Sequence, residues 1–290
     1  MCENNPMTSL RLKDATRNQL QRAQKLHRRE QRTRHSQFLV EGPQAVREIL
    51  THRIDLVRDL YATEAALDRY SEIRTLAATH GVWTHLVDSD DFRDLSADGQ
   101  GLVVVANMPE QSDPTAVLDG THLAVATVAT ADPGNLGTII RTADAAGAGA
   151  VLVGKGSAEL TSPKVVRSTA GSLFHVPCVA GLSLEQIVSH AHAAGMQVLA
   201  AEGTGEWELS ALQNNAYDAR LIGATIDGPD LRRPTLWVLG NEAHGFEGLD
   251  LSLVDATVSI PLYGSAESLN VSIAGAVCIY ASAMVQRTEL

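Results

Sequence analysis

The fold is decided by the stretch THLAVATVATADPGNLGTIIRTADAAGAGAVLVG, which spans residues 121–154. An apolar strand pattern over 121–130 is followed by a helical pattern over 135–147 and a second apolar strand over 150–154. Strands that are apolar throughout suit a parallel sheet with both faces covered. The stretch therefore predicts a strand–helix–strand unit of an α/β fold.

The same alternation extends to both sides of this stretch. Toward the C-terminus we predict strands over 196–202 and 236–240 and a long final helix over 269–287. Shorter strands and helices alternate between 38 and 108, which predicts a smaller α/β domain. The segment after residue 108 is rich in Pro, Ser, Asp and Gly and has no periodicity, which indicates a linker. We thus predict a domain over 1–108, a linker over 109–118 and a second domain over 119–290.

Positive charge is concentrated at the N-terminus. Residues 1–40 hold nine Lys or Arg and three acidic residues, although the whole chain has a net charge of −11. Such asymmetry indicates a basic arm that contacts a polyanion. The alternative is a solvated helix with many basic residues. Leu12, Leu20 and Leu26 are too sparse for a buried face, so we predict an exposed helix over 10–36.

Several classes of protein are disfavoured by composition and spacing. No apolar run reaches eighteen residues and the N-terminus lacks a signal-peptide pattern, so we expect a cytoplasmic protein without a membrane segment. The three cysteines lie far apart in the sequence, so we predict no disulfides. The histidines lack the spacing of metal ligands, so we predict no metal site. Residues 147–157 are similar to a phosphate-binding loop of kinases, but Gly156 stands where that loop has Ser or Thr. The dinucleotide motif G-x-G-x-x-G is absent from the strand-to-helix junctions, which argues against a dehydrogenase.

Three strand-to-helix junctions carry polar residues where ligands bind in open α/β sheets. In DPGNLGTIIRTADAAGA (132–148), Asn135 can cap the helix, and Arg141 points away from the apolar stripe. Arg141 is then free to meet a phosphate or ribose. The alternative is a surface arginine paired with Asp144 three residues later.

The other two junctions are LWVLGNEAHGFEG (236–248) and SIPLYGSAESLNVSIAGA (259–276). Gly240 allows close backbone approach to a ligand. Glu242 follows it, and its alternative role is that of a helix-start carboxylate. In the third junction Ser268 can cap the last helix, and Asn270 then falls in the first turn, where its amide could orient a ligand hydroxyl.

Together these junctions resemble the SpoU (TrmH-like) family of RNA 2′-O-methyltransferases of the SPOUT superfamily. The family motifs appear in order as NLGTIIR (135–141), GNEAHG (240–245), and IPL with ESLNVS between 260 and 272. The match covers about 119–290. Residues 10–108 resemble the family's N-terminal substrate-binding domain, and the sequence from Gln24 through 50 is similar to members that modify ribosomal RNA.

The resemblance implies a domain that contains a trefoil knot and binds S-adenosyl-methionine. Such knots are rare in proteins. It implies a homodimer with the active site near the subunit interface and a reaction that needs no metal. The positions that match cofactor contacts are Gly240, Asn241, Ile260 and Leu269. Those that match catalytic positions are Asn135, Arg141, Glu242, Ser268 and Asn270.

The resemblance also suggests a division of labour in catalysis. Asn135 and Asn270 would orient the ribose and Arg141, Glu242 would brace the site, and Ser268 would hydrogen-bond within the third motif. The general-base role implied for Arg141 conflicts with a guanidinium pKa above about 12. Two alternatives stay open: a phosphate or carboxylate assists deprotonation, or Arg141 stabilises the developing alkoxide.

The sequence therefore predicts an enzyme that transfers a methyl group from S-adenosyl-methionine to a ribose 2′-hydroxyl of RNA. Ribosomal RNA is the favoured substrate, and both a housekeeping modification and antibiotic resistance stay open. The alternatives are a transfer RNA 2′-O-methyltransferase and a catalytically silent RNA-binding protein. Intact Asn135, Arg141, Glu242 and Asn270 argue against the silent protein.

Overall fold

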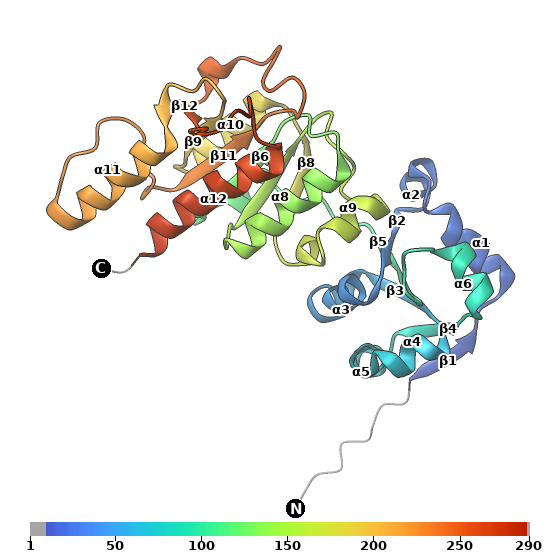
Figure 1. Ribbon diagram of the computed structural model, residues 1–290. Helices are drawn as coiled ribbons and strands as arrows, with labels where there is room; N and C mark the ends of the chain where they lie inside the picture. The colour runs from blue at the N-terminus through green and yellow to red at the C-terminus, as the bar shows by residue number, and fades with distance from the viewer. Residues whose placement is uncertain (1–9, 289–290) are drawn as a thin grey trace, which may run out of the picture. The chain divides into compact units, whose positions relative to one another are not determined.

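The computed structural model describes residues 10–288, which form two compact units (Figure 1). Unit 1 comprises residues up to 110 together with 159–175, and unit 2 comprises 111–158 and 176 onward. Residues 159–175, which fall inside the predicted 119–290 domain, thus pack with unit 1. The boundaries of the functional domains themselves stay a prediction.

Unit 1 contains a five-stranded mixed sheet in the order β1-β4-β3-β5-β2. The strands β1, β4 and β3 run parallel, and β5 is antiparallel to both β3 and β2. The strands are β1 (Arg11–Asp14), β2 (Gln37–Glu41), β3 (Val57–Ala62), β4 (Trp83–Leu86) and β5 (Leu102–Asn107). The helices are α1 (Arg17–Lys25), α2 (Arg29–His35), α3 (Pro43–His52), α4 (Glu64–Arg69), α5 (Ser71–Thr79), α6 (Ser89–Leu95) and α9 (Pro163–Ser168), with 3-10 turns at Ile54–Leu56 and Ser172–Phe174.

Alternation along β2 explains how both faces of this sheet are covered. Phe38 and Val40 face the cluster formed with α3 and α5, whereas Leu39 faces the cluster formed with α1 and α6. Val166 of α9 joins the first cluster. The predicted small α/β domain is therefore confirmed as a two-faced sheet with its own core.

The prediction of one exposed helix over 10–36 is wrong. These residues form β1, α1 and α2, and Ala23 and Leu26 are buried in the cluster beneath α1. The side chain of Arg32 is buried as well, because its guanidinium donates to Glu159 and to the carbonyls of Leu26 and His27. Sparse leucines sufficed here because the sheet strands and the neighbouring α6 supply most of the apolar surface.

Unit 2 contains a seven-stranded sheet in the order β10-β12-β9-β11-β6-β7-β8, and all its pairings are parallel. The predicted parallel sheet is confirmed. The strands are β6 (Leu123–Thr127), β7 (Ala150–Gly154), β8 (Cys178–Leu182), β9 (Gln197–Ala201), β10 (Trp207–Glu208), β11 (Thr235–Leu239) and β12 (Ala256–Ser259). The helices are α7 (Pro114–Leu118), α8 (Pro133–Ala145), α10 (Leu184–Ala193), α11 (Leu209–Ile222) and α12 (Val271–Arg287), with a 3-10 turn at Leu251–Leu253.

Helices cover both faces of this sheet. On one face α8 and α12 pack against each other (Figure 1). Buried Trp237 of β11 donates to Ser282 of α12 over 2.9 Å. On the other face α7 and α10 pack together. Within the predicted linker over 109–118, residues Pro114–Leu118 form α7, which Asp113 caps, and Leu118 is fully buried; the linker itself stays a prediction. Within residues 10–288, no helix is long and apolar enough to cross a membrane.

Candidate active site

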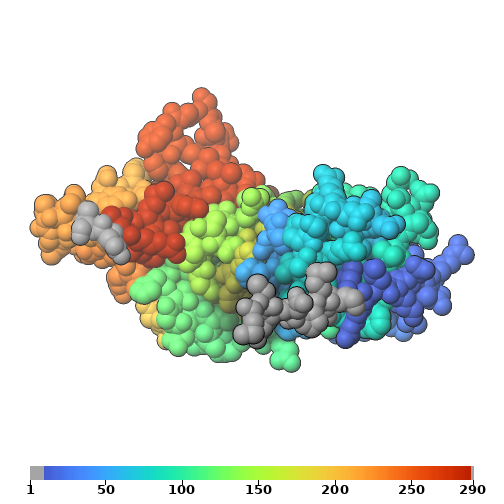
Figure 2. Space-filling model, turned by 90° about the horizontal axis from the view of Figure 1, so that it is seen from below, coloured from blue at the N-terminus to red at the C-terminus, as the bar shows by residue number. Residues whose placement is uncertain are grey.

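Four loops of unit 2 meet at one edge of its sheet. They follow the carboxyl ends of β6, β9, β11 and β12, and parallel strands place these ends together. The loops after β6 and β12 lead into α8 and α12, whose first turns therefore lie at the same edge. The segment after β11, orange-red in Figure 2, stands out from the surface.

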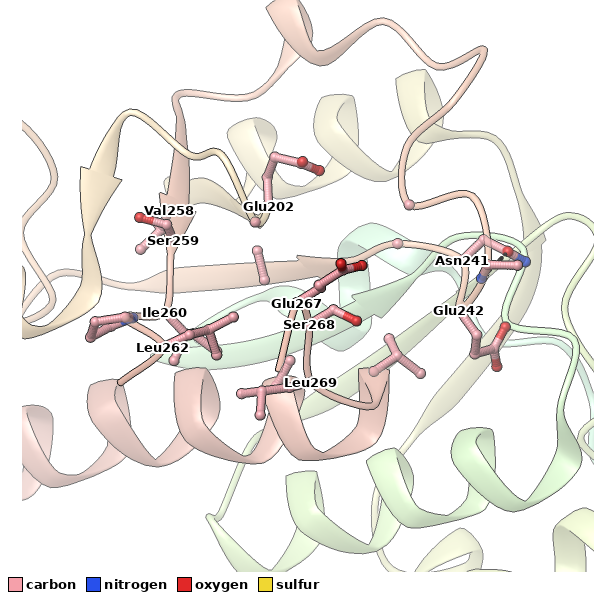
Figure 3. Close-up of a pocket in the computed structure, with 18 residues that line it drawn as sticks. Glu202, Asn241, Glu242, Val258, Ser259, Ile260, Leu262, Glu267, Ser268 and Leu269 are labelled. Carbon is pink, nitrogen blue, oxygen red and sulfur yellow. Dashed lines mark hydrogen bonds between the residues drawn. The ribbon is translucent and has the colours of Figure 1, made fainter. Parts of the chain in front are cut away.

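A cavity of about 560 Å³ opens between the loops after β9, β11 and β12. Figure 3 shows Ile260, Leu262 and Leu269 on one side of this cavity and Asn241 and Glu242 on the other. All four residues predicted to contact the cofactor line it, as do two of the predicted catalytic residues. These six are Gly240, Asn241, Glu242, Ile260, Ser268 and Leu269.

The loop after β11 is closed by a pair of backbone hydrogen bonds between Asn241 and Gly245, of 2.8 and 3.0 Å. A Cβ on Gly240 would lie 2.8 Å from the carbonyl oxygen of Gly245, so this tight return requires glycine. The side chain of Asn241 donates to the carbonyl of Ala129 over 2.6 Å and so ties this loop to the one after β6. Asn241 thus shapes the cavity wall that it also lines.

Three residues, one from each of the three sequence motifs, form a hydrogen-bond chain beside the cavity. Asn135 donates its Nδ2 to Oε1 of Glu242 over 3.2 Å, and Nδ2 of Asn270 donates to Oδ1 of Asn135 over 3.1 Å. Oδ1 of Asn270 accepts from the backbone and hydroxyl of Ser272. A carboxylate only accepts and a backbone N–H only donates, so the two ends fix the orientation of both amides.

Glu242 also holds the start of α8. Its carboxylate accepts from the backbone N–H groups of Ala131 and Asp132, each over 3.4 Å. The bracing role of Glu242 stays a prediction, and these contacts support it. Because both carboxylate oxygens already face N–H donors, Glu242 is poorly placed to receive a proton from a substrate.

Two expectations about helix caps are wrong. Asp132 rather than Asn135 caps α8, with its carboxylate accepting from the Asn135 backbone, so Asn135 lies in the first turn. Asn270 rather than Ser268 caps α12. Asp132 has the extended backbone that a cap needs, and the side chain of Asn270 accepts from the backbone N–H of Ser272, as a cap does. The side chains of Asn135 and Asn270 are thereby brought together.

Arg141 is the one predicted site residue outside both the cavity and the hydrogen-bond chain. It follows Asn135 by six residues on α8, which places it about 9 Å along the axis and roughly 120° around it. Its side chain is exposed, and its guanidinium makes no hydrogen bond or ion pair among residues 10–288. The alternative pairing with Asp144 is therefore not formed, and the catalytic role of Arg141 stays a prediction.

The prediction missed the residues that line the cavity at the end of β9, which include Glu202 and Gly203. Their signal was present, because the predicted strand over 196–202 ends in a carboxylate followed by a Gly-Thr-Gly loop. Glu267 also lines the cavity and adds a further carboxylate to the wall. Three acidic residues, Glu202, Glu242 and Glu267, thus line this cavity.

Residues 122–280, which include all of these loops, match the family model described as the SpoU rRNA Methylase family. The chain belongs to this family. Residues 17–104 match a second model, the MRM3-like substrate binding domain. The SpoU match contains the hydrogen-bond chain and the whole cavity, and the second match lies within unit 1.

Relatives in the SpoU family align over most of this chain. It is 34% identical to the 23S rRNA (guanosine(2553)-2′-O)-methyltransferase RlmP of Bacillus subtilis, over 88% of this chain and 92% of that protein. It is 31% identical to the 23S rRNA (uridine(2479)-2′-O)-methyltransferase of Streptomyces viridochromogenes, over 88% and 85%. The structure of the SpoU methyltransferase AviRb from S. viridochromogenes with the cofactor AdoMet has a TM-score of 0.73 and 30% identity, covering 91% and 96%.

Proposed function

We propose that this protein transfers a methyl group from S-adenosyl-methionine to a ribose 2′-hydroxyl of ribosomal RNA. The observation that carries the proposal is the hydrogen-bond chain from Glu242 through Asn135 to Asn270 beside the cavity. It gives a rigid polar rim next to a pocket, which is what an in-line transfer between two held reactants needs.

The residues of the cavity fit the cofactor. S-adenosyl-methionine has an adenine ring with apolar faces, positive charge on its sulfonium and ammonium groups, and one carboxylate. Ile260, Leu262 and Leu269 offer apolar surface, and Glu202 and Glu267 offer negative charge. When bound, the cofactor supplies an electrophilic methyl group. The protein's own residues would hold it between the loop closed by Asn241 and Gly245 and the loop leading to α12.

The remaining residues act on the ribose. With its amide orientation fixed, the Asn135–Asn270 pair presents a defined edge for hydrogen bonds to a hydroxyl. The hydroxyl proton must leave as the oxygen–methyl bond forms, and a guanidinium, which is a cation without an acceptor site, cannot take it. We therefore assign Arg141 to phosphate binding and to stabilisation of the developing oxyanion, and the proton to solvent or an RNA phosphate.

A homodimer would bring Arg141 to an active site. On α12 the residues Ile273, Val277, Tyr280 and Met284 recur every three or four positions and are 38–55% exposed. We propose that a second copy covers this stripe, because such a stripe is rare on a monomer surface. Since α8 packs beside α12, Arg141 of one protomer would then face the partner's cavity. In line with the family, we further propose a trefoil knot between β11 and α12.

Ribosomal RNA is favoured over transfer RNA for two reasons. RlmP of B. subtilis and the S. viridochromogenes enzyme both carry 23S rRNA in their names and align with unit 1 as well as unit 2. Of the nine basic residues in 1–40, eight lie exposed on unit 1, where they can neutralise phosphates.

We propose that the protein meets this RNA in the cytoplasm. Mapping 2′-O-methyl sites in cellular RNA with and without the protein would identify the modified nucleotide. It would also show whether this methylation confers antibiotic resistance. Gain of a site only in transfer RNA would contradict the proposal.

The role of Arg141 is tested by Arg141→Ala and Arg141→Lys. We expect the alanine variant to lose transfer by about 100-fold or more, as for other groups that stabilise an oxyanion. Calorimetric affinity for S-adenosyl-methionine should stay near the wild-type value because Arg141 does not line the cavity. The lysine variant keeps the charge and should recover part of the rate. Cofactor affinity that falls together with the rate would contradict this assignment.

A further inference from the structure

Three metal-ligating side chains meet in unit 1, outside the candidate active site. Glu48 and His52 are four residues apart on α3 (Figure 1), and His175 follows the 3-10 turn Ser172–Phe174. One ligand atom from each side chain lies within 4.8 Å of the others. We propose that Glu48, His52 and His175 bind a divalent transition metal such as Zn²⁺.

The distances match those between donors around such an ion. Nε2 of His175 lies 3.2 Å from Oε2 of Glu48, and Nε2 of His52 lies 3.4 Å from the same oxygen. Neighbouring donors in a tetrahedral zinc site are roughly 3.3 Å apart, because each bond is about 2.0–2.1 Å long. The two imidazole rings meet edge to face, with centroids 4.5 Å apart. They therefore approach the carboxylate oxygen from different directions, as separate ligands do.

Glu48 is fixed in the orientation that this site requires. Its side chain is 18% exposed, and its other oxygen, Oε1, lies 3.3 Å from Nε of Arg47. Oε2 is thus left to face the imidazoles while Oε1 is held by a hydrogen bond, which is how carboxylate ligands are usually supported. Gly171 packs against the Glu48 side chain with φ of +103°, and a Cβ there would overlap Cγ of Glu48.

The bound ion would join segments far apart in the sequence. Glu48 and His175 are separated by 127 residues, so the metal would tie α3 to the last residue of the 159–175 segment of unit 1. Two imidazoles and one carboxylate suit Zn²⁺, Co²⁺ or Ni²⁺ rather than Mg²⁺ or Ca²⁺. The side chain of His52 is 47% exposed, which leaves room for water as the fourth ligand. The site would act as a structural clamp and is independent of methyl transfer.

The test uses Co²⁺ as a spectroscopic probe of the full chain without a histidine tag, after treatment with a chelator. We expect one equivalent to bind, with visible absorption typical of tetrahedral nitrogen and oxygen ligands and without thiolate charge-transfer bands. Zn²⁺ should displace it and should raise the melting temperature, because it binds the folded form. His52→Ala and His175→Ala should each weaken Co²⁺ binding by about tenfold or more.

The matched control is His192→Ala. His192 also faces a carboxylate, Asp255, at 3.1 Å, but it lies in unit 2 and has no second imidazole beside it in the described part of the chain. This variant should bind Co²⁺ like the wild type. Melting temperatures in chelator show whether each variant is folded. Binding that is unchanged in the His52 and His175 variants, or an absence of saturable binding to the folded wild type, would mean that the three side chains form only an ion-pair cluster.

Discussion

Replacing Arg32 by alanine should destabilise unit 1 far more than replacing its neighbour Arg29. Both guanidinium groups approach the same carboxylate, Glu159, at 2.6 Å for Arg32 and 3.5 Å for Arg29. The side chain of Arg32 is 4% exposed and that of Arg29 is 81% exposed. The pair of variants thus compares a buried and a solvated partner of one acid.

The magnitude follows from burial. Removing one partner of a buried ion pair costs about 3–5 kcal/mol, and the lower end of this range applies here because the Glu159 side chain is 21% exposed. Arg32→Ala also leaves the carbonyls of Leu26 and His27 without their donor. An exposed pair contributes only about 0–1 kcal/mol, so Arg29→Ala should change little. Since domains are stable by about 5–15 kcal/mol, the Arg32 variant should lose a large share of that.

Hydrogen exchange by mass spectrometry on the full chain measures this effect locally, in peptides that cover β2 and α9. We expect the free energy of opening there to fall by about 3 kcal/mol or more in Arg32→Ala and by less than about 1 kcal/mol in Arg29→Ala. Equal and small losses in the two variants would refute the structural role of Arg32.

The same ion pair predicts a pH dependence. Burial raises the pKa of the Glu159 carboxyl, but hydrogen bonds from Arg32 and Thr161 and the charges of Arg32 and Arg29 outweigh it, so the pKa lies below its ordinary value. The stability that Glu159 contributes is then fully present above the unfolded pKa of about 4.5 and is lost as pH falls through the lowered folded value. In Arg32→Ala this acid-dependent loss should largely disappear from the stability profile of unit 1.

Three further predictions concern unit 2. Asn270→Ala should cost about 1 kcal/mol of stability because α12 loses its cap, whereas Asn270→Ser keeps a cap. Both variants should lose methyl transfer because Asn135 loses its hydrogen-bond donor, and full activity in either variant would show that the hydrogen-bond chain is not needed for transfer. Gly240→Ala should weaken S-adenosyl-methionine binding through the clash with Gly245, whereas Gly264→Ala, which meets nothing within 4 Å and lies outside the cavity lining, should not; equal affinities by calorimetry would contradict this. Val277→Arg should yield monomers in sedimentation and lose activity, and an intact dimer would show that the α12 stripe is not the interface.

Patterns that depend on neighbours in the sequence predicted much of the fold. Alternation of apolar strands with helices gave the parallel sheet of unit 2, and Pro43 marked the first residue of α3. The motif loops were placed correctly at strand ends, because that edge follows from the strand direction alone. Cofactor-lining residues such as Ile260 and Leu269 came from the family resemblance rather than from periodicity.

Features that depend on distant partners escaped prediction. Arg32 has the sequence context of an exposed basic helix, and only its contact with Glu159, 127 residues away, buries it. The cap lies at Asp132, three residues before Asn135, since Asp, Asn and Ser compete as caps with similar propensity. The pairing of His52 with His175 likewise has no local signal beyond the spacing of Glu48 and His52.

The most direct test of the central claim is methyl transfer in vitro with labelled S-adenosyl-methionine. Ribosomal RNA and transfer RNA that lack the modification are incubated separately with the protein, digested to nucleosides and analysed by mass spectrometry. We predict one 2′-O-methylated nucleoside from ribosomal RNA, with the label on the ribose and none with Asn135→Ala. Label found only on a base, or only in transfer RNA, would contradict the account.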